Sequence, residues 1–180
     1  MLKITIPDVE YYDEAKWEFK VLKGQTITLE HSLVSLSKWE SKFKKPFLSD
    51  DAKTKEEVIE YVKCMTLTQN VPDRIYNNLS NENLKQVHDY IHDSMTATWF
   101  SEDKKSTKNR EIITSEIIYY SMFANQIPIE CQKWHLNRLL TLIRVFSIKN
   151  TPPKKMSQRE ILERNKAIND ARRAKLGSRG

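Results

Sequence analysis

The stretch QTITLEHSLVSLSKWESKF, residues 25–43, contains the change of period that decides the fold. At its start, Ile27 and Leu29 alternate with polar residues, which is the period of a half-buried β-strand. From His31 the apolar residues recur at steps of three and four, as on one face of an α-helix. That helix is expected to stop before Pro46, which disfavours helical geometry at the preceding residue. The sequence therefore predicts a strand followed directly by a helix.

Two earlier runs have the same strand period. Apolar and polar residues alternate in Leu2–Ile6 and again in Trp17–Val21. Gly24 then interrupts the pattern, so we expect a small antiparallel sheet with a turn at Lys23-Gly24. A sheet of this size is not stable alone and must pack on helices.

Further segments carry the start signals of helices. Thr54–Glu57 has the form of a capping box and opens a helix through Met65. Ser80 and Thr114 are each expected to cap a later helix. Between those two helices, residues 101–109 are polar and predict an exposed loop. The apolar face of the helix after Ser80 is expected to contain Leu84, Val87, Ile91 and Met95.

The last helix of the body is expected to begin at Pro128, which suits a first helical turn, and to run through about Lys149. It is apolar on most sides, and a helix of that kind is usually buried. We therefore expect it at the centre of a helical bundle. Most of the aromatic residues in or beside such apolar segments (Trp39, Trp99, Trp134, Tyr119 and Tyr120) are expected in the core, whereas Tyr11 and Tyr12 precede a charged stretch and are candidates for exposure.

The C-terminal thirty residues differ from the rest in charge. Residues 151–180 contain nine basic and three acidic residues and so carry the whole formal net charge of +6. Pro152-Pro153 marks a stiff linker, and Ser157–Glu160 forms a second capping box that opens a helix to about Lys175. The predicted fold is α+β and predominantly α-helical. A body of residues 1–150, β-rich over 1–30 and helical over 31–150, precedes a basic linker and helix over 151–180.

Composition excludes several classes of protein. The three glycines, at positions 24, 177 and 180, cannot form a glycine-rich phosphate or dinucleotide loop. No apolar run approaches the roughly 18 residues of a membrane-spanning helix, and the first residues lack the features of a signal peptide. We expect a protein of the cytoplasm with no membrane partner, in which Cys64 and Cys131 are reduced.

One constellation could bind a metal ion. His88 and His92 are four residues apart on one predicted helix, and Cys131 and His135 have the same spacing on another. Together they offer one cysteine and three histidines to zinc, but the short cysteine spacing of structural zinc sites is missing. No nucleophile or paired carboxylate has a local signature either. We therefore expect no metal, no cofactor and no enzymatic activity.

Several segments resemble a protein family of phages and prophages. They are residues 4–7 (ITIP), 29–40 (LEHSLVSLSKWE), 95–100 (MTATWF), 133–144 (KWHLNRLLTLIR) and 152–156 (PPKKM). The similarity spans nearly the whole chain, and the family resembles the tail-assembly chaperones of long-tailed phages. Such chaperones are thought to coat the tape-measure protein and to recruit tail-tube subunits in the cytoplasm of the bacterial host. The resemblance implies the same role here, with no catalytic residues to carry over.

The basic helix is the expected contact for a partner. We expect Arg159, Arg164, Lys166, Arg172 and Arg173 to bind an acidic client or a neighbouring copy in a homo-oligomer. Two alternatives remain open. The chain could be a virion structural component, such as a connector or tail-completion protein. It could also bind nucleic acid through the basic tail, the less favoured partner.

Overall fold

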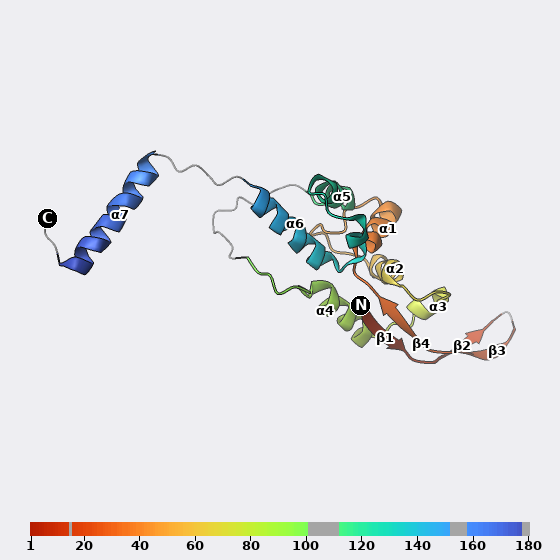
Figure 1. Cartoon of the computed structure of the whole chain (residues 1–180). Coiled ribbons are helices and arrows are strands. Elements are labelled where there is room, and N and C mark those ends of the chain that lie inside the picture. The colour runs from red at the N-terminus through yellow and green to blue at the C-terminus, as the bar shows by residue number, and fades with distance from the viewer. Residues whose placement is uncertain (15, 101–111, 152–157, 178–180) are drawn as a thin grey trace. The chain divides into compact units, whose positions relative to one another are not determined.

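The computed structural model describes residues 1–14, 16–100, 112–151 and 158–177 (Figure 1). The chain divides into two compact units, 1–147 and 148–180. The fold is α+β and mainly helical, as predicted. In the part of the chain that is described, no helix is both long enough and apolar enough to cross a membrane.

The N-terminal strands form a two-stranded antiparallel ribbon, so the predicted sheet is confirmed but the predicted turn is not. β1 (Leu2–Ile6) pairs antiparallel with β4 (Gln25–Leu29), and β2 (Val9–Asp13) pairs antiparallel with β3 (Glu18–Leu22). The chain therefore reverses between β2 and β3, and the turn predicted at Lys23-Gly24 is wrong. Strand β2 was not predicted, since VEYYD lacks a clean alternation of apolar and polar residues.

Residues 23 and 24 instead lie opposite residues 7 and 8, at the junction between the pair β1–β4 and the pair β2–β3. We call this junction the crossing. The Gly24 N–H donates to the Asp8 side chain, with N and Oδ1 2.6 Å apart. A Cβ on Gly24 would lie 2.2 Å from the Ile6 carbonyl oxygen, so this crossing excludes any side chain. Glycine is thus required by close backbone approach and not by a turn.

The pair β1–β4 packs on helices, as predicted. Ile4, Ile6, Ile27 and Leu29 are all buried, which follows from the two-residue period of both strands. Backbone bonds extend this layer, because the Glu30 N–H donates to the Met65 carbonyl at the end of the next helix but one.

Helices α1 (Leu33–Phe43) and α2 (Lys55–Met65) both begin at capping boxes. Ser32 caps α1, which was not predicted from the sequence. Thr54 exchanges hydrogen bonds with Glu57 at the start of α2, as predicted. α1 ends at Lys44, whose left-handed backbone (φ 56°) closes the helix before Pro46. The buried Trp39 of α1 donates its indole N–H to the Glu57 carbonyl, with N and O 2.9 Å apart.

The middle of the chain has a short helix α3 (Asp73–Tyr76) and the longer α4 (Asn81–His92). Ser80 caps α4 as predicted. The helix ends at His92, however, so Met95 lies beyond it in left-handed backbone (φ 49°) and not on its apolar face. The loop predicted over residues 101–109 lies outside the described residues.

Helix α5 (Ser115–Ala124) begins after Thr114, but the Thr114 side chain makes no capping bond. The cap comes from α1. The buried Glu40 carboxylate accepts the Ser115 N–H through Oε2 at 2.7 Å and the Phe47 N–H through Oε1 at 2.9 Å. One side chain thereby holds both the start of α5 and the segment after α1.

The predicted single helix from Pro128 is wrong in two respects. A 3₁₀ helix, η1 (Ile129–Lys133), comes first, and α6 (Leu136–Asn150) follows separately. The break has a clear cause in the backbone pairing. His135 forms an antiparallel β-bridge with Ser32, and the Leu136 N–H donates to the His31 carbonyl at 2.7 Å, so neither residue continues a helix from η1. Of the α6 side chains, Leu136 and Leu139 are buried while Leu140, Ile143 and Phe146 are only partly covered, so α6 is not at the centre of the core.

The second unit contains α7 (Gln158–Leu176), a helix of 19 residues. Every one of its described side chains is exposed. The linker Pro152-Pro153 and the capping box Ser157–Glu160 expected before it lie outside what the structure describes.

Candidate protein-binding surfaces

The four candidate metal ligands do not come together. His88 and His92 stack on α4 with ring centroids 4.1 Å apart. Cys131 is buried in η1 as a free thiol, and the His135 Nε2 lies 3.0 Å from the Tyr90 carbonyl oxygen. Among the described residues, no group of three or more His, Cys, Asp or Glu side chains is placed to hold a metal ion.

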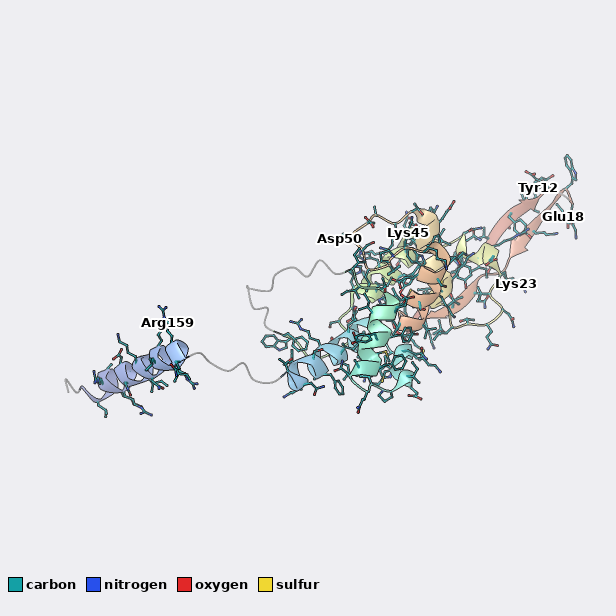
Figure 2. All side chains as sticks on the ribbon, turned by 90° about the horizontal axis from the view of Figure 1, so that it is seen from above. Tyr12, Glu18, Lys23, Lys45, Asp50 and Arg159 are labelled. Atoms are coloured by element: carbon teal, nitrogen blue, oxygen red, sulfur yellow. The ribbon has the colours of Figure 1, made fainter. Side chains whose placement is uncertain are left out.

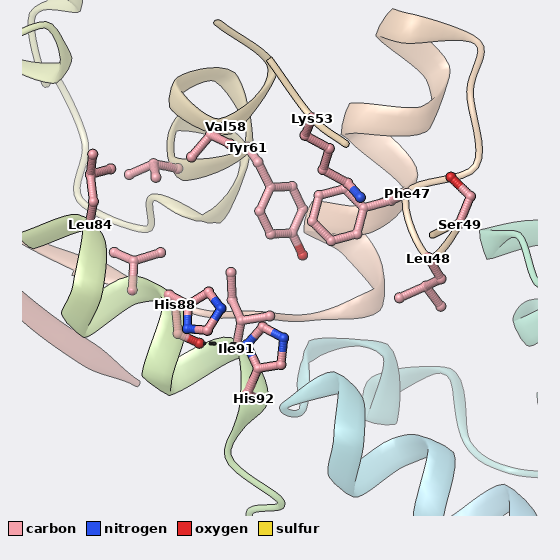
Figure 3. Close-up of a pocket in the computed structure, with 12 residues that line it drawn as sticks. Phe47, Leu48, Ser49, Lys53, Val58, Tyr61, Leu84, His88, Ile91 and His92 are labelled. Carbon is pink, nitrogen blue, oxygen red and sulfur yellow. Dashed lines mark hydrogen bonds between the residues drawn. The ribbon is translucent and has the colours of Figure 1, made fainter. Parts of the chain in front are cut away.

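An open apolar groove lies between α2, α4 and the segment 47–53 (Figure 3). We call it the α2–α4 groove, and its volume is about 350 Å³. Its apolar lining comes from Phe47, Leu48, Val58, Tyr61, Val62, Leu84, Val87 and Ile91. An apolar hollow that the chain's own side chains leave open is a usual feature of a binding site.

The walls of the groove combine a stacked aromatic pair with basic groups. Phe47 stacks on Tyr61 with ring centroids 3.9 Å apart, and the Lys53 ammonium lies 4.7 Å from the Phe47 ring centroid. His88 and His92 line the opposite side (Figure 3), where the His92 Nδ1 donates to the His88 carbonyl at 2.8 Å. The groove therefore offers an apolar interior with cationic and polar groups around it.

Behind the groove lies a buried polar cluster. The Tyr61 hydroxyl bonds the His31 Nδ1, the His31 ring meets the His135 ring edge-on at 5.1 Å, and the Tyr90 hydroxyl donates to Glu30 at 2.7 Å. Burial, with help from nearby His135 and His92, lowers the pKa of His31 to about 3. Burial also raises the pKa of Tyr61 far above its ordinary value. The hydrogen bond with His31 holds the Tyr61 hydroxyl, and the ring of Tyr61 forms a wall of the groove.

A second exposed surface lies on the hairpin β2–β3, which extends beyond the helices of its unit (Figure 1). Tyr12 pairs across the strands with Phe19, and Glu10 pairs with Val21, so these four share one face. Their apolar side chains are exposed, Phe19 by 77%. The opposite face contains Tyr11. The Arg74 guanidinium of α3 lies over the Tyr11 ring, 5.0 Å from its centroid, in a cation–π contact. We call the exposed face of Glu10, Tyr12, Phe19 and Val21 the hairpin outer face.

The tip of the hairpin adds one more aromatic group. Trp17 is 84% exposed and has left-handed backbone (φ 53°). Tyr12, Glu14 and Trp17 line a shallow depression there. Figure 2 shows Tyr12 and Glu18 on this part of the chain. The expectation that Tyr12 is exposed is thus met, whereas Trp99 and Tyr120, expected in the core, are exposed by 82% and 73%.

The third surface is α7, where the five predicted contact residues do not share a face. With about 100° between successive helical residues, Arg164 and Arg172 lie with Ile161 and Ile168 in one sector. Arg159, Lys166 and Arg173 are spaced by seven on the other side of the helix. Arg159 there pairs with Glu163, with Nε and Oε1 3.2 Å apart.

Comparison with protein-family models, with curated proteins and with solved structures found no match to this chain.

Proposed function

We propose that this chain is a tail-assembly chaperone of a long-tailed phage, acting in the host cytoplasm, and that it holds a helical segment of the tape-measure protein in the α2–α4 groove. The observation that carries the proposal is the open apolar groove of about 350 Å³ between α2 and α4. Recruitment of tail-tube subunits belongs to the same role and rests on the resemblance alone.

The form of the groove suits a helical client. A helix that lies in a groove anchors itself by apolar side chains at steps of three, four and seven residues. Val58 from α2 and Leu84 from α4 are only partly buried and face such a client from two sides. The Lys53 ammonium favours an acidic residue beside the apolar stripe of the client. A chaperone of this kind needs a binding surface and no catalytic group.

The experiment is a co-purification with the tape-measure candidate encoded by the same phage. Leu84→Glu and Val58→Glu each place a charge in the groove, and each is expected to weaken capture of the client by about ten-fold, the loss of one apolar anchor. Tyr120→Glu, on the exposed face of α5, is the matched control and should capture the client normally. Circular dichroism and urea midpoints confirm that all three variants are folded.

Undiminished capture by both groove variants would rule out the α2–α4 groove as the client site. If no complex forms and the protein is found in purified virions, it is a structural component of the particle instead.

Nucleic-acid binding is the second candidate, favoured by the six basic residues exposed along α7. Contact with about five phosphates gives a log–log salt slope of roughly −4 to −5. A titration of duplex and single-stranded DNA at several salt concentrations separates the two roles, since a protein client predicts a shallower slope and no DNA affinity in moderate salt.

A further inference from the structure

The hairpin outer face is an exposed sheet surface that combines apolar and acidic side chains. Tyr12 and Phe19 lie side by side on it with ring centroids 5.1 Å apart, and both are exposed. Glu10 lies on this face, and Glu14 lies with Tyr12 and Trp17 around the depression at its tip, so acidic groups flank the exposed aromatic rings. Exposed aromatic groups on a projecting ribbon of this kind are typical of a contact with another molecule.

α7 has the complementary composition. It contains six basic and three acidic residues, a formal charge of +3. Ile161, Arg164, Ile168, Arg172 and Lys175 fall within roughly a quarter of the helix circumference, since successive residues are about 100° apart. This isoleucine face is exposed throughout and combines two branched apolar side chains with three cations.

We propose that the isoleucine face of α7 packs on the hairpin outer face of a second copy of this chain. Ile161 and Ile168 cover Tyr12, Phe19 and Val21, while Arg164, Arg172 and Lys175 meet Glu10 and Glu14. The sizes agree, because the two isoleucines are separated by about 10 Å along the helix and a five-residue strand is about 17 Å long. A helix packed on one face of a ribbon is an ordinary way to cover an exposed sheet surface.

Such a contact joins two different surfaces, so it is heterologous. Each copy offers one hairpin and one α7, and the association continues from copy to copy or closes into a ring. The contact needs no client and is independent of the α2–α4 groove. Its test is therefore made on this chain alone, and the outcome does not depend on the proposed function.

The experiment is sedimentation velocity on the full chain over a range of concentrations, at low and at high salt. The mass is expected to rise with concentration and to fall when about 0.5 M salt shortens the Debye length to a few ångströms. Phe19→Ser, which alters an exposed side chain, and the pair Arg164→Glu with Arg172→Glu should each weaken association by at least ten-fold. The pair Arg159→Glu with Lys166→Glu makes the same charge change on the other side of α7 and should associate normally.

A mixing experiment gives the sharpest test. The Phe19→Ser chain keeps an intact α7, and the Arg164→Glu, Arg172→Glu chain keeps an intact hairpin. At a concentration where each variant alone is monomeric, an equimolar mixture should therefore form a one-to-one dimer. A wild-type chain that is monomeric at every concentration overturns the proposal. So does a mixture that stays monomeric, or an equal loss of association in the Arg159→Glu, Lys166→Glu control.

Discussion

Gly24 shows how a single residue can be fixed by its backbone neighbours. A Cβ at this position would lie 2.2 Å from the Ile6 carbonyl oxygen and 2.6 Å from the Pro7 carbonyl carbon. Both are backbone atoms and cannot turn away, so Gly24→Ala must displace one strand pair from the other. We expect a loss of about 1–3 kcal/mol in the free energy of unfolding, as for other overpacked sites.

Urea denaturation measures that loss. Lys23→Ala, at the exposed neighbouring position, is the control and should change stability little. A Gly24→Ala chain with the midpoint of the wild type would show that the crossing relaxes at no cost.

Glu40 is the second residue on which distant segments depend. Its carboxylate accepts the Phe47 and Ser115 N–H groups, which would otherwise be buried without a partner. Glu40→Ala leaves both donors unsatisfied and should cost about 2–6 kcal/mol, since each buried unsatisfied donor costs about 1–3 kcal/mol.

Glu40→Gln separates the two bonds. Its amide oxygen can accept from one N–H, but its NH₂ group faces the other donor, so the variant should lie between wild type and Glu40→Ala in thermal unfolding. If the alanine variant is as stable as the glutamine variant, the hydrogen bond that glutamine keeps adds no stability, because water accepts that N–H in the alanine variant.

At the scale of the element, local signals were predictable and pairing was not. The capping boxes at Thr54 and Ser80 use residues three positions apart, and both helices begin where the sequence predicts. The strand period identified β1, β3 and β4, yet it contains no information on which strands pair. The partner of β3 depends on the crossing at Gly24, a close approach of two segments distant in the sequence.

The break between η1 and α6 was not predictable for the same reason. The run from Pro128 has helical periodicity. However, His135 and Leu136 make backbone contacts with Ser32 and His31, which are more than a hundred residues earlier in the sequence. The α2–α4 groove was likewise predictable only in part. Periodicity predicted that Leu84, Val87 and Ile91 share a face, but how much of that face other helices cover depends on the tertiary packing.

For the whole molecule, the buried polar cluster sets a dependence of stability on pH. The folded protein holds the pKa of His31 near 3, below its ordinary value of 6.5. Between these values the unfolded chain binds a proton that the folded chain does not, so stability falls as the pH drops from about 6.5 toward 3. The contribution of His31 to this slope is at most about 1.4 kcal/mol per pH unit.

His31→Asn isolates that contribution. Asparagine does not titrate and can still bond the Tyr61 hydroxyl, so the variant should be less stable at pH 7 but lose stability less steeply between pH 6.5 and 4. Urea midpoints at half-unit steps of pH give the slope of stability against pH for the wild type and for the variant. The carboxylates of the protein contribute equally to the two slopes, so their difference belongs to His31. Parallel slopes would mean that His31 gains its proton without unfolding.

The bond between Glu40 and Ser115 also has a consequence for the time course of synthesis. The two residues are 75 positions apart, and a ribosome adds about 5–20 residues per second. The carboxylate of α1 is therefore made roughly 4–15 s before the N–H group that it will hold. During that interval the nascent chain must keep a carboxylate destined for the interior in contact with water, so the final packing of α1 has to wait for α5 to leave the ribosome.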